Sequence, residues 1–443
     1  MVRKFILIAA VSIVGIGAER LIGAQEAGTP KSLEERVLIL EKKWEGSPET
    51  GDETRAVVTI GKDGFAIKAA DGSFQLRIGG TIQSDYRAYL SDVNQTGVNQ
   101  FLLRRVRPIL EGTVNRIVDF RLVPDFGGGA AVIQDAYLDV KALPGLKLRS
   151  GKFKPYVGLE QLQSDSFLAF VERGLPSDLV PQRSVGAQLI EDLWKGAVNL
   201  AAGVFDGTTN SANVDGDTGD EKEYVGRIWV QPFKNTFWEA LQQFGLGISG
   251  TSGKRLGTLT TANLPTYKTE GQESFFGYNS TTFANGKRSR ISPQGYWYTG
   301  PFGLLGEYVA SSQEVTNVAA TRTSTKLTDT AWQITASYVI TGENATYKGV
   351  EPRRGVDEHG PGAWEIAARY SELRTDPNSF SLYADPTKSA SRAQSWTAGV
   401  NWYLTSRLKA VANYENVRFA QGGAGNTDRP REQAILSRFQ VVF

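Results

Sequence analysis

From residue 73 onward, apolar and polar side chains alternate along the chain with a period of two. In residues 74–86 the apolar positions share one face and the polar or charged positions share the other. A strand of this length exceeds the five or six residues typical of soluble sheets and suits a tilted membrane crossing of about 9–11 residues. The alternation recurs in residues 118–122, 132–141 and 227–231. The pattern predicts an all-β, antiparallel fold.

The connections between the predicted strands fall into two classes. Residues 143–145, 298–303 and 404–407 form short turns, whereas residues 206–223, 251–287, 315–327, 375–391 and 421–429 form long polar segments. Bacterial outer-membrane barrels have short periplasmic turns and long extracellular loops. The sequence therefore predicts a transmembrane β-barrel.

The number of strands follows from the requirement that both chain ends lie on the periplasmic side, which makes the number even. Seventeen segments of the sequence have a strand-like pattern, and one of them is 273–284. Counting back from the C-terminus places that segment in a long outer loop and leaves 16 strands. An 18-stranded barrel and a large soluble sandwich are the alternatives. Closure of the barrel lets every backbone N–H and C=O group of the wall form a hydrogen bond, which is necessary in lipid, where water is absent.

The residues before the barrel divide into three parts. Residues 1–24 have the layout of a secretory signal peptide, with Arg3 and Lys4 before an apolar run and small residues near Ala24. A membrane anchor is the alternative, but Glu19 and Arg20 interrupt the run short of the roughly 20 apolar residues needed. Residues 31–45 show a two-heptad amphipathic pattern that predicts a short coiled-coil helix, and residues 46–72 are a linker leading into the barrel at 73–443.

Composition excludes several classes of function. The chain has no cysteine and a single histidine, His359, so thiolate metal sites and a cysteine nucleophile are excluded, and a histidine-based catalytic site would depend on one residue. The formal net charge is only +2, which argues against a nucleic-acid binder. We therefore expect no enzymatic activity, no cofactor and no metal.

The last strand and one loop suggest partners. Residues 435–443 alternate and end at Phe443, a pattern that resembles the signal read by the barrel-assembly machinery of outer-membrane proteins. The acidic segment 206–223 carries six carboxylates against one lysine. Contact with lipopolysaccharide through divalent cations and simple loop solubility are both interpretations of it.

The sequence resembles the phosphate-selective porin O and P family of Gram-negative outer membranes. Several segments show the resemblance, in the same order along the chain. They include Phe101-Leu102-Leu103-Arg104-Arg105-Val106-Arg107 and Phe170-Val171-Glu172-Arg173-Gly174-Leu175-Pro176, and residues 79–86, 134–137, 143–154, 183–186, 300–308, 362–371 and 400–404. It implies a 16-stranded, homotrimeric, anion-preferring porin in the outer membrane. It also implies that a loop near residues 156–182 folds inward and narrows the channel.

The same resemblance implies which residues line the constriction. Arginine is suited to phosphate because its planar fork donates two hydrogen bonds. The predicted constriction residues are Arg104, Arg105, Arg107, Lys152, Lys154, Arg173 and Arg183, with Asp135 orienting a nearby guanidinium. Alternation puts Arg105 and Arg107 on the lumen side, whereas Arg104 falls on the opposite face unless a bulge intervenes. Relatives carry arginine where this chain has Thr81. The expected function is passive diffusion of small anions, phosphate first; a general porin of weak selectivity and a plugged structural barrel are the alternatives.

Overall fold

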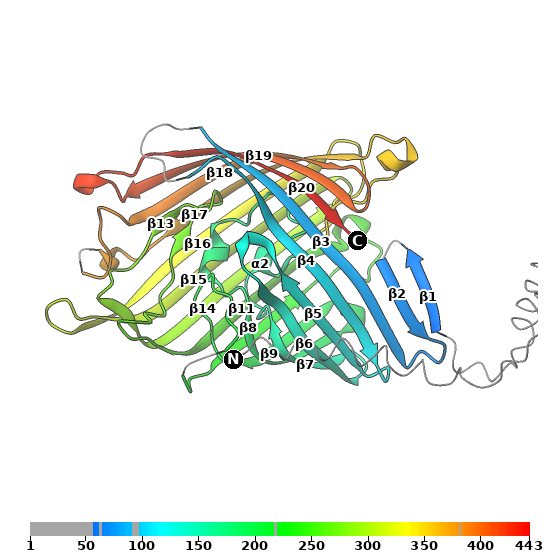
Figure 1. Ribbon diagram of the computed structural model, residues 1–443, viewed down its shortest axis with the longest axis horizontal. Coiled ribbons are helices and arrows are strands. Elements are labelled where there is room, and N and C mark those ends of the chain that lie inside the picture. Colours follow the sequence, from blue (N-terminus) through cyan, green and yellow to red (C-terminus); the bar gives the residue numbers. More distant parts are fainter. Residues whose placement is uncertain (1–55, 62–63, 91–96, 217–218, 381) are drawn as a thin grey trace, which may run out of the picture. The chain divides into compact units, whose positions relative to one another are not determined.

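The computed structural model describes residues 56–61, 64–90, 97–216, 219–380 and 382–443 (Figure 1). The predicted signal peptide at 1–24 and the predicted helix at 31–45 lie outside the described residues. Within the described ranges, no helix has both the length and the apolar character needed to cross a membrane.

Sixteen strands of the described chain form a closed antiparallel barrel, which confirms the predicted number (Figure 1). Each strand pairs with its neighbours in sequence, and the last strand pairs with the first to close the ring. The strands are β3 (Phe74–Tyr89), β4 (Gln100–Val114), β5 (Val118–Asp125), β6 (Val132–Leu143), β7 (Leu146–Phe153), β8 (Ser184–Leu193), β9 (Val198–Phe205), β10 (Glu223–Val230), β11 (Gln243–Leu256), β14 (Thr282–Thr299), β15 (Phe302–Asn317), β16 (Thr323–Val339), β17 (Ala363–Arg374), β18 (Ala390–Tyr403), β19 (Leu408–Gln421) and β20 (Glu432–Val442).

A hairpin precedes the barrel and shares one edge of β3 with the final strand. Strands β1 (Ala56–Gly61) and β2 (Gly64–Ala69) lie in the segment predicted as a linker, and β2 pairs with the first half of β3. Strand β20 pairs with the second half. At the junction, Gly80 and Phe443 exchange backbone hydrogen bonds of 2.8 and 3.0 Å, and the Phe443 ring lies where a side chain at position 80 would be. Glycine at 80 therefore allows the chain terminus to close on the barrel.

The side chains of the wall alternate as the sequence predicts. On β3, Ile82 is exposed on the outer face, whereas Gln83 and Asp85 are buried in the interior. An exposed apolar outer face and a polar interior are what a barrel in lipid requires.

The connections differ in length at the two ends of the barrel, with two departures from the prediction. The segment 315–327 was expected to be a long loop, but the strands extend into it and leave only 318–322, because the Thr and Ser run alternates. At the short-turn end, residues 340–362 form a long connection. Short helical turns occur at η2 (Gly127–Gly129), η4 (Trp194–Gly196), η5 (Glu239–Leu241), η6 (Val356–Glu358), η7 (Pro377–Ser379) and η8 (Ala424–Asn426).

At least four of the described connections pack inside the barrel, and one of them, residues 206–222, places Asn210 against Ser311 and Arg290 of the wall. The inner loop, residues 154–183, contains α2 (Leu159–Leu162) and η3 (Leu175–Leu179). The segment 257–281 carries β12 (Tyr267–Lys268) and β13 (Ser274–Phe276), and its aromatic side chains join aliphatic side chains of the inner loop in one buried cluster against the wall. From the short-turn end, Tyr347 donates a hydrogen bond of 2.6 Å to the carbonyl of Leu159. This packing against the wall of β15 to β19 leaves cavities open beside β4 to β7 and a further one at the short-turn end.

Candidate functional site: a charged neck in the barrel

Two cavities meet inside the barrel beside the inner loop. The upper cavity has a volume of about 560 Å³ and lies toward the long loops, and the lower cavity has a volume of about 260 Å³. Three residues line both cavities, namely Arg107, Asp165 and Arg183. We call the place where these three residues meet the neck.

A β-bulge on β4 brings three arginines to the interior. Gln83 of β3 pairs with Arg105, but the next residue, Ser84, pairs with Leu103, so Arg104 has no partner across the ladder. The extra residue resets the alternation, and Arg104, Arg105 and Arg107 all point inward. Alternation along the sequence places Arg104 on the outer face unless a bulge intervenes, and this bulge turns its side chain inward.

Asp165 of the inner loop is the carboxylate on which the arginines converge. It forms ion pairs with Arg107 and Arg173, and Arg105 lies 3.4 Å away. Burial alone would raise the pKa of Asp165, but the guanidinium groups of Arg105, Arg173 and Arg107 outweigh burial and hold that pKa well below its usual range. Asp165 is therefore an anion at neutral pH and fixes the directions of the arginine side chains around the neck.

Glu172 connects a second point of the inner loop to the barrel wall through ion pairs. It accepts hydrogen bonds of 2.6 and 3.2 Å from Arg104, and Arg87 lies 3.1 Å away. Arg438, which is bidentate on Asp85, is 3.6 Å from Glu172. Burial would raise the pKa of Glu172, but Arg104 and Arg105 lower it far more. The inner loop is thus held by buried ion pairs as well as by apolar contacts.

A second bulge positions Asp135 and its partner. Val123 of β5 pairs with Asp135, but Pro124 pairs with Ile133, so the register skips Gln134. Asp135 accepts a hydrogen bond of 3.2 Å from Arg183 and lies 3.8 Å from Arg121. Asp135 therefore orients Arg183 at the neck.

The two predicted lysines occupy different places. Lys154 lines the lower cavity and donates to the carbonyl of Gln163 at 2.9 Å. Burial, reinforced by the nearby charge of Arg173, lowers the pKa of the Lys154 amine well below its usual value. Lys152 lines neither cavity and pairs with Asp215 of the long loop 206–222. The structure thus brings together the predicted residues Arg104, Arg105, Arg107, Asp135, Lys154, Arg173 and Arg183, and leaves Lys152 aside.

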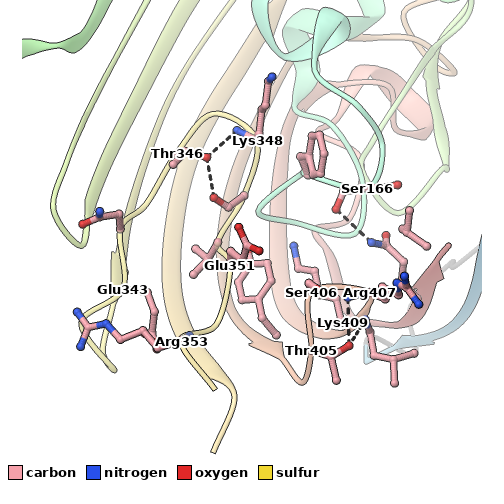
Figure 2. A pocket seen from close by; sticks show the side chains of 18 residues that line it. Ser166, Glu343, Thr346, Lys348, Glu351, Arg353, Thr405, Ser406, Arg407 and Lys409 are labelled. Atoms are coloured by element: carbon pink, nitrogen blue, oxygen red, sulfur yellow. Dashed lines mark hydrogen bonds between the residues drawn. The ribbon is translucent and has the colours of Figure 1, made fainter. Parts of the chain in front are cut away.

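Below the neck the interior opens into a vestibule of about 790 Å³ at the short-turn end (Figure 2). Ser166 lines both the vestibule and the lower cavity, and its carbonyl accepts a hydrogen bond of 3.1 Å from Gln440. The charged residues of the vestibule are mostly basic; they are Lys348, Arg353, Arg407 and Lys409, with Glu343 and Glu351 (Figure 2). The cavities therefore follow one another from the long loops to the short turns.

Comparison with known proteins identifies the family. Residues 76–443 match the phosphate-selective porin O and P family. The chain belongs to this family. Porin O of Pseudomonas aeruginosa is 24% identical over 421 residues, which cover 87% of this chain and 92% of that protein.

Solved structures share the fold of this porin at low sequence identity. The outer membrane channel DcaP of Acinetobacter baumannii has a TM-score of 0.54 at 10% identity, covering 84% of this chain and 98% of that one. In-vitro folded OmpT of Vibrio cholerae, in its trimer form, has a TM-score of 0.50 at 10% identity and covers 84% and 100%. The chain is accordingly an outer-membrane porin, and its family and barrel indicate a channel rather than an enzyme.

Two features of this porin were not assigned from the sequence. Asp165 and Glu172 lie in the loop expected to fold inward, and the sequence places Glu172 directly beside Arg173. The four carboxylates of residues 156–182, against the single Arg173, were the available signal. The arginine that each carboxylate meets, however, depends on contacts between distant segments. Among the described residues, no group of histidine and carboxylate side chains is arranged to hold a metal ion. His359 is exposed in the 340–362 segment.

Proposed function

We propose that this porin conducts small anions, phosphate or a related oxyanion, through the neck, where they pass Arg107 and Arg183. The observation that carries the proposal is that both guanidinium groups line the upper and the lower cavity, so an ion passing between the cavities meets both. Arg105 and Arg173 line the upper cavity and form ion pairs with Asp165.

The chemistry of the neck suits a hydrated oxyanion. A selective channel replaces part of the hydration shell with protein groups while binding weakly enough to release the ion. Arginine supplies paired donors to phosphate oxygens. Asp165 and Asp135 already accept hydrogen bonds from these arginines, so they reduce the net positive charge and favour release of the bound anion. The basic residues of the vestibule favour anions on the exit side.

The assembly and export of this porin complete the proposal. A homotrimer is supported by the solved trimer form of OmpT, which shares the fold. The terminal Phe443, half-exposed at the end of β20, is in a position to be read by the barrel-assembly machinery before the strand closes on Gly80. Residues 1–24 act as the export signal in this account.

A planar-bilayer experiment tests the function. The purified porin is inserted under a chloride gradient, the reversal potential is measured, and phosphate is then added at millimolar concentration. We expect an anion-selective reversal potential and inhibition of the chloride current by phosphate. A cation-selective potential contradicts the proposal. Chloride current that is indifferent to phosphate leaves a weakly selective porin, and absence of current indicates a plugged barrel.

A further inference from the structure

The outer face of the barrel carries a row of exposed lysines near the long-loop end. Lys254 of β11 lies directly across from Lys287 of β14 in the ladder. Lys222 precedes β10 on one side of this pair, and Lys326 lies on β16 on the other. Lys222 is paired with Asp206 at 3.3 Å, whereas within the described ranges no carboxylate forms an ion pair with Lys254 or Lys287. Lys254 and Lys287 therefore form the centre of a cationic row.

The height of this row corresponds to the edge of the membrane. At the other end of the same two strands, Phe244 pairs with Trp297, ten residues away from Lys254 and Lys287. With a rise of about 3.3 Å per residue and a tilt of about 45°, ten residues span about 23 Å of membrane thickness. The apolar band of an outer-membrane barrel is about 25 Å tall and is flanked by aromatic residues. The two lysines thus lie at the outer boundary of the lipid-facing band.

An apolar groove lies directly below the lysines on the lipid-facing surface. Ala202, Gly226 and Gly250 pair in one row across β9, β10 and β11. A side chain built on Gly226 would meet no atom within 4 Å, so the surface there is open. Tyr224 and Ser252 border the row on the side of the lysines, and Ile228 and Ile248 border it on the other side. The hollow around this row has a volume of about 860 Å³.

We propose that the row and the groove together bind a phosphate-bearing glycolipid of the outer leaflet, which is lipopolysaccharide. A lipid phosphate contacts Lys254 and Lys287, and an acyl chain lies in the groove over Gly226. The height of the lysines favours this occupant over a second copy of the chain, because Lys254 and Lys287 lie at the outer boundary of the lipid-facing band, where lipid phosphates lie. Glu314 lies between Lys287 and Lys326 and accepts the backbone N–H of Lys287 at 2.9 Å, so it opposes binding at that edge. The inference does not depend on which anion the channel conducts.

The test measures binding of fluorescently labelled lipopolysaccharide to the full-length porin in detergent. Each lysine near an anionic lipid surface contributes about 1 kcal/mol, which corresponds to about fivefold in affinity. The double variant Lys254→Gln/Lys287→Gln should therefore bind about 25-fold more weakly. Gly226→Leu, which fills the groove, should weaken binding severalfold, and Glu314→Gln should strengthen it. Lys388→Gln, at an exposed lysine paired with Asp385 in another long loop, is the matched control and should bind as the parent does.

Further arms separate the lipid from other occupants. Unchanged chloride conductance in each variant shows that the barrel is folded. Dephosphorylated lipopolysaccharide should bind the parent porin as weakly as intact lipopolysaccharide binds the double variant. Equal binding of parent and double variant, or equal binding of the two lipid forms, overturns the proposal. Loss of the oligomer in Gly226→Leu with unchanged lipid binding also overturns it and assigns the groove to a contact between copies.

Discussion

Arg107 and Asp165 form an ion pair at the point where the two interior cavities meet. One partner belongs to the wall strand β4 and the other to the inner loop, so the pair joins the loop to the wall at the narrow part of the channel. The same contact offsets part of the positive charge that a passing anion meets. Structure and selectivity at the neck therefore depend on the same residues.

Removing the charge of Asp165 should make the neck more selective for anions and the protein less stable. Asp165→Asn leaves three buried guanidinium groups without their shared anion, and breaking a buried ion pair typically costs about 3–5 kcal/mol. The net positive charge of the neck rises, so the reversal potential under a chloride gradient should shift further toward that of chloride. A shift toward the cation potential would show that Asp165 does not set the charge of the neck.

Removing the charge of Glu172 should loosen the inner loop with little effect on the charge at the neck. Glu172→Gln breaks the contacts with Arg104 and Arg87, and we expect a loss of about 3–5 kcal/mol and increased current noise from the mobile loop. Thermal unfolding and single-channel recordings measure the two effects. Lys388→Ala, which breaks an exposed pair worth about 0–1 kcal/mol, is the control. Equal stability of the two variants would contradict the role of Glu172.

The stability of the porin should depend on pH through Asp178. Burial raises the pKa of Asp178 to about 7, although its carboxylate accepts hydrogen bonds from Lys268 and Ser211 of two other inward segments. The pKa of Asp178 in the folded protein lies above its value of about 4 in the unfolded chain. The contribution of Asp178 to the free energy of unfolding is therefore fully present below pH 4 and is lost as the pH rises toward 7. At about 1.4 kcal/mol per pKa unit, it is at most on the order of 4 kcal/mol. Asp178→Asn should therefore reduce the fall in melting temperature between pH 4 and pH 7. A variant whose melting temperature depends on pH as strongly as that of the parent would contradict this assignment.

Adding an arginine at position 81 should increase anion selectivity. The Thr81 side chain is buried in the interior, lines the lower cavity and lies directly across from Arg107 in the ladder. Thr81→Arg places a further cation below the neck, so the reversal potential should move toward that of chloride while conductance falls. Ser84→Arg, on the lipid-facing side of the same strand, should instead destabilise the barrel by about 2–4 kcal/mol. Unchanged selectivity in Thr81→Arg would contradict the path through the lower cavity.

The barrel could be predicted from the sequence because every strand of its wall alternates lipid-facing and interior-facing residues. Alternation in strands such as β3, together with the need for an even number, predicts 16 strands. The same parity places Arg105 and Arg107 inside the barrel. It fails at Arg104, because one inserted residue reverses the face and no local signal marks the bulge.

The interior was harder to predict, because its contacts join distant segments. The meeting of Asp165 with Arg105, Arg107 and Arg173 depends on how the inner loop crosses the lumen. The support of that loop by Tyr347 was also missed, since residues 340–362 lie at the end where short turns are the rule. Lys152 shows that closeness in sequence does not ensure closeness in space: it lies just before the inner loop in the sequence, but pairs with Asp215 and lines neither cavity of the neck.

Phosphate inhibition of the chloride current in Arg107→Gln/Arg183→Gln tests the central claim most directly. Arg374→Gln, which removes an exposed arginine that lines neither cavity, is the matched control. Loss of two charged donors to phosphate should raise the phosphate concentration needed for half-inhibition by about tenfold or more, with the control unchanged. Half-inhibition at the same phosphate concentration in the double variant and in the parent would contradict the account.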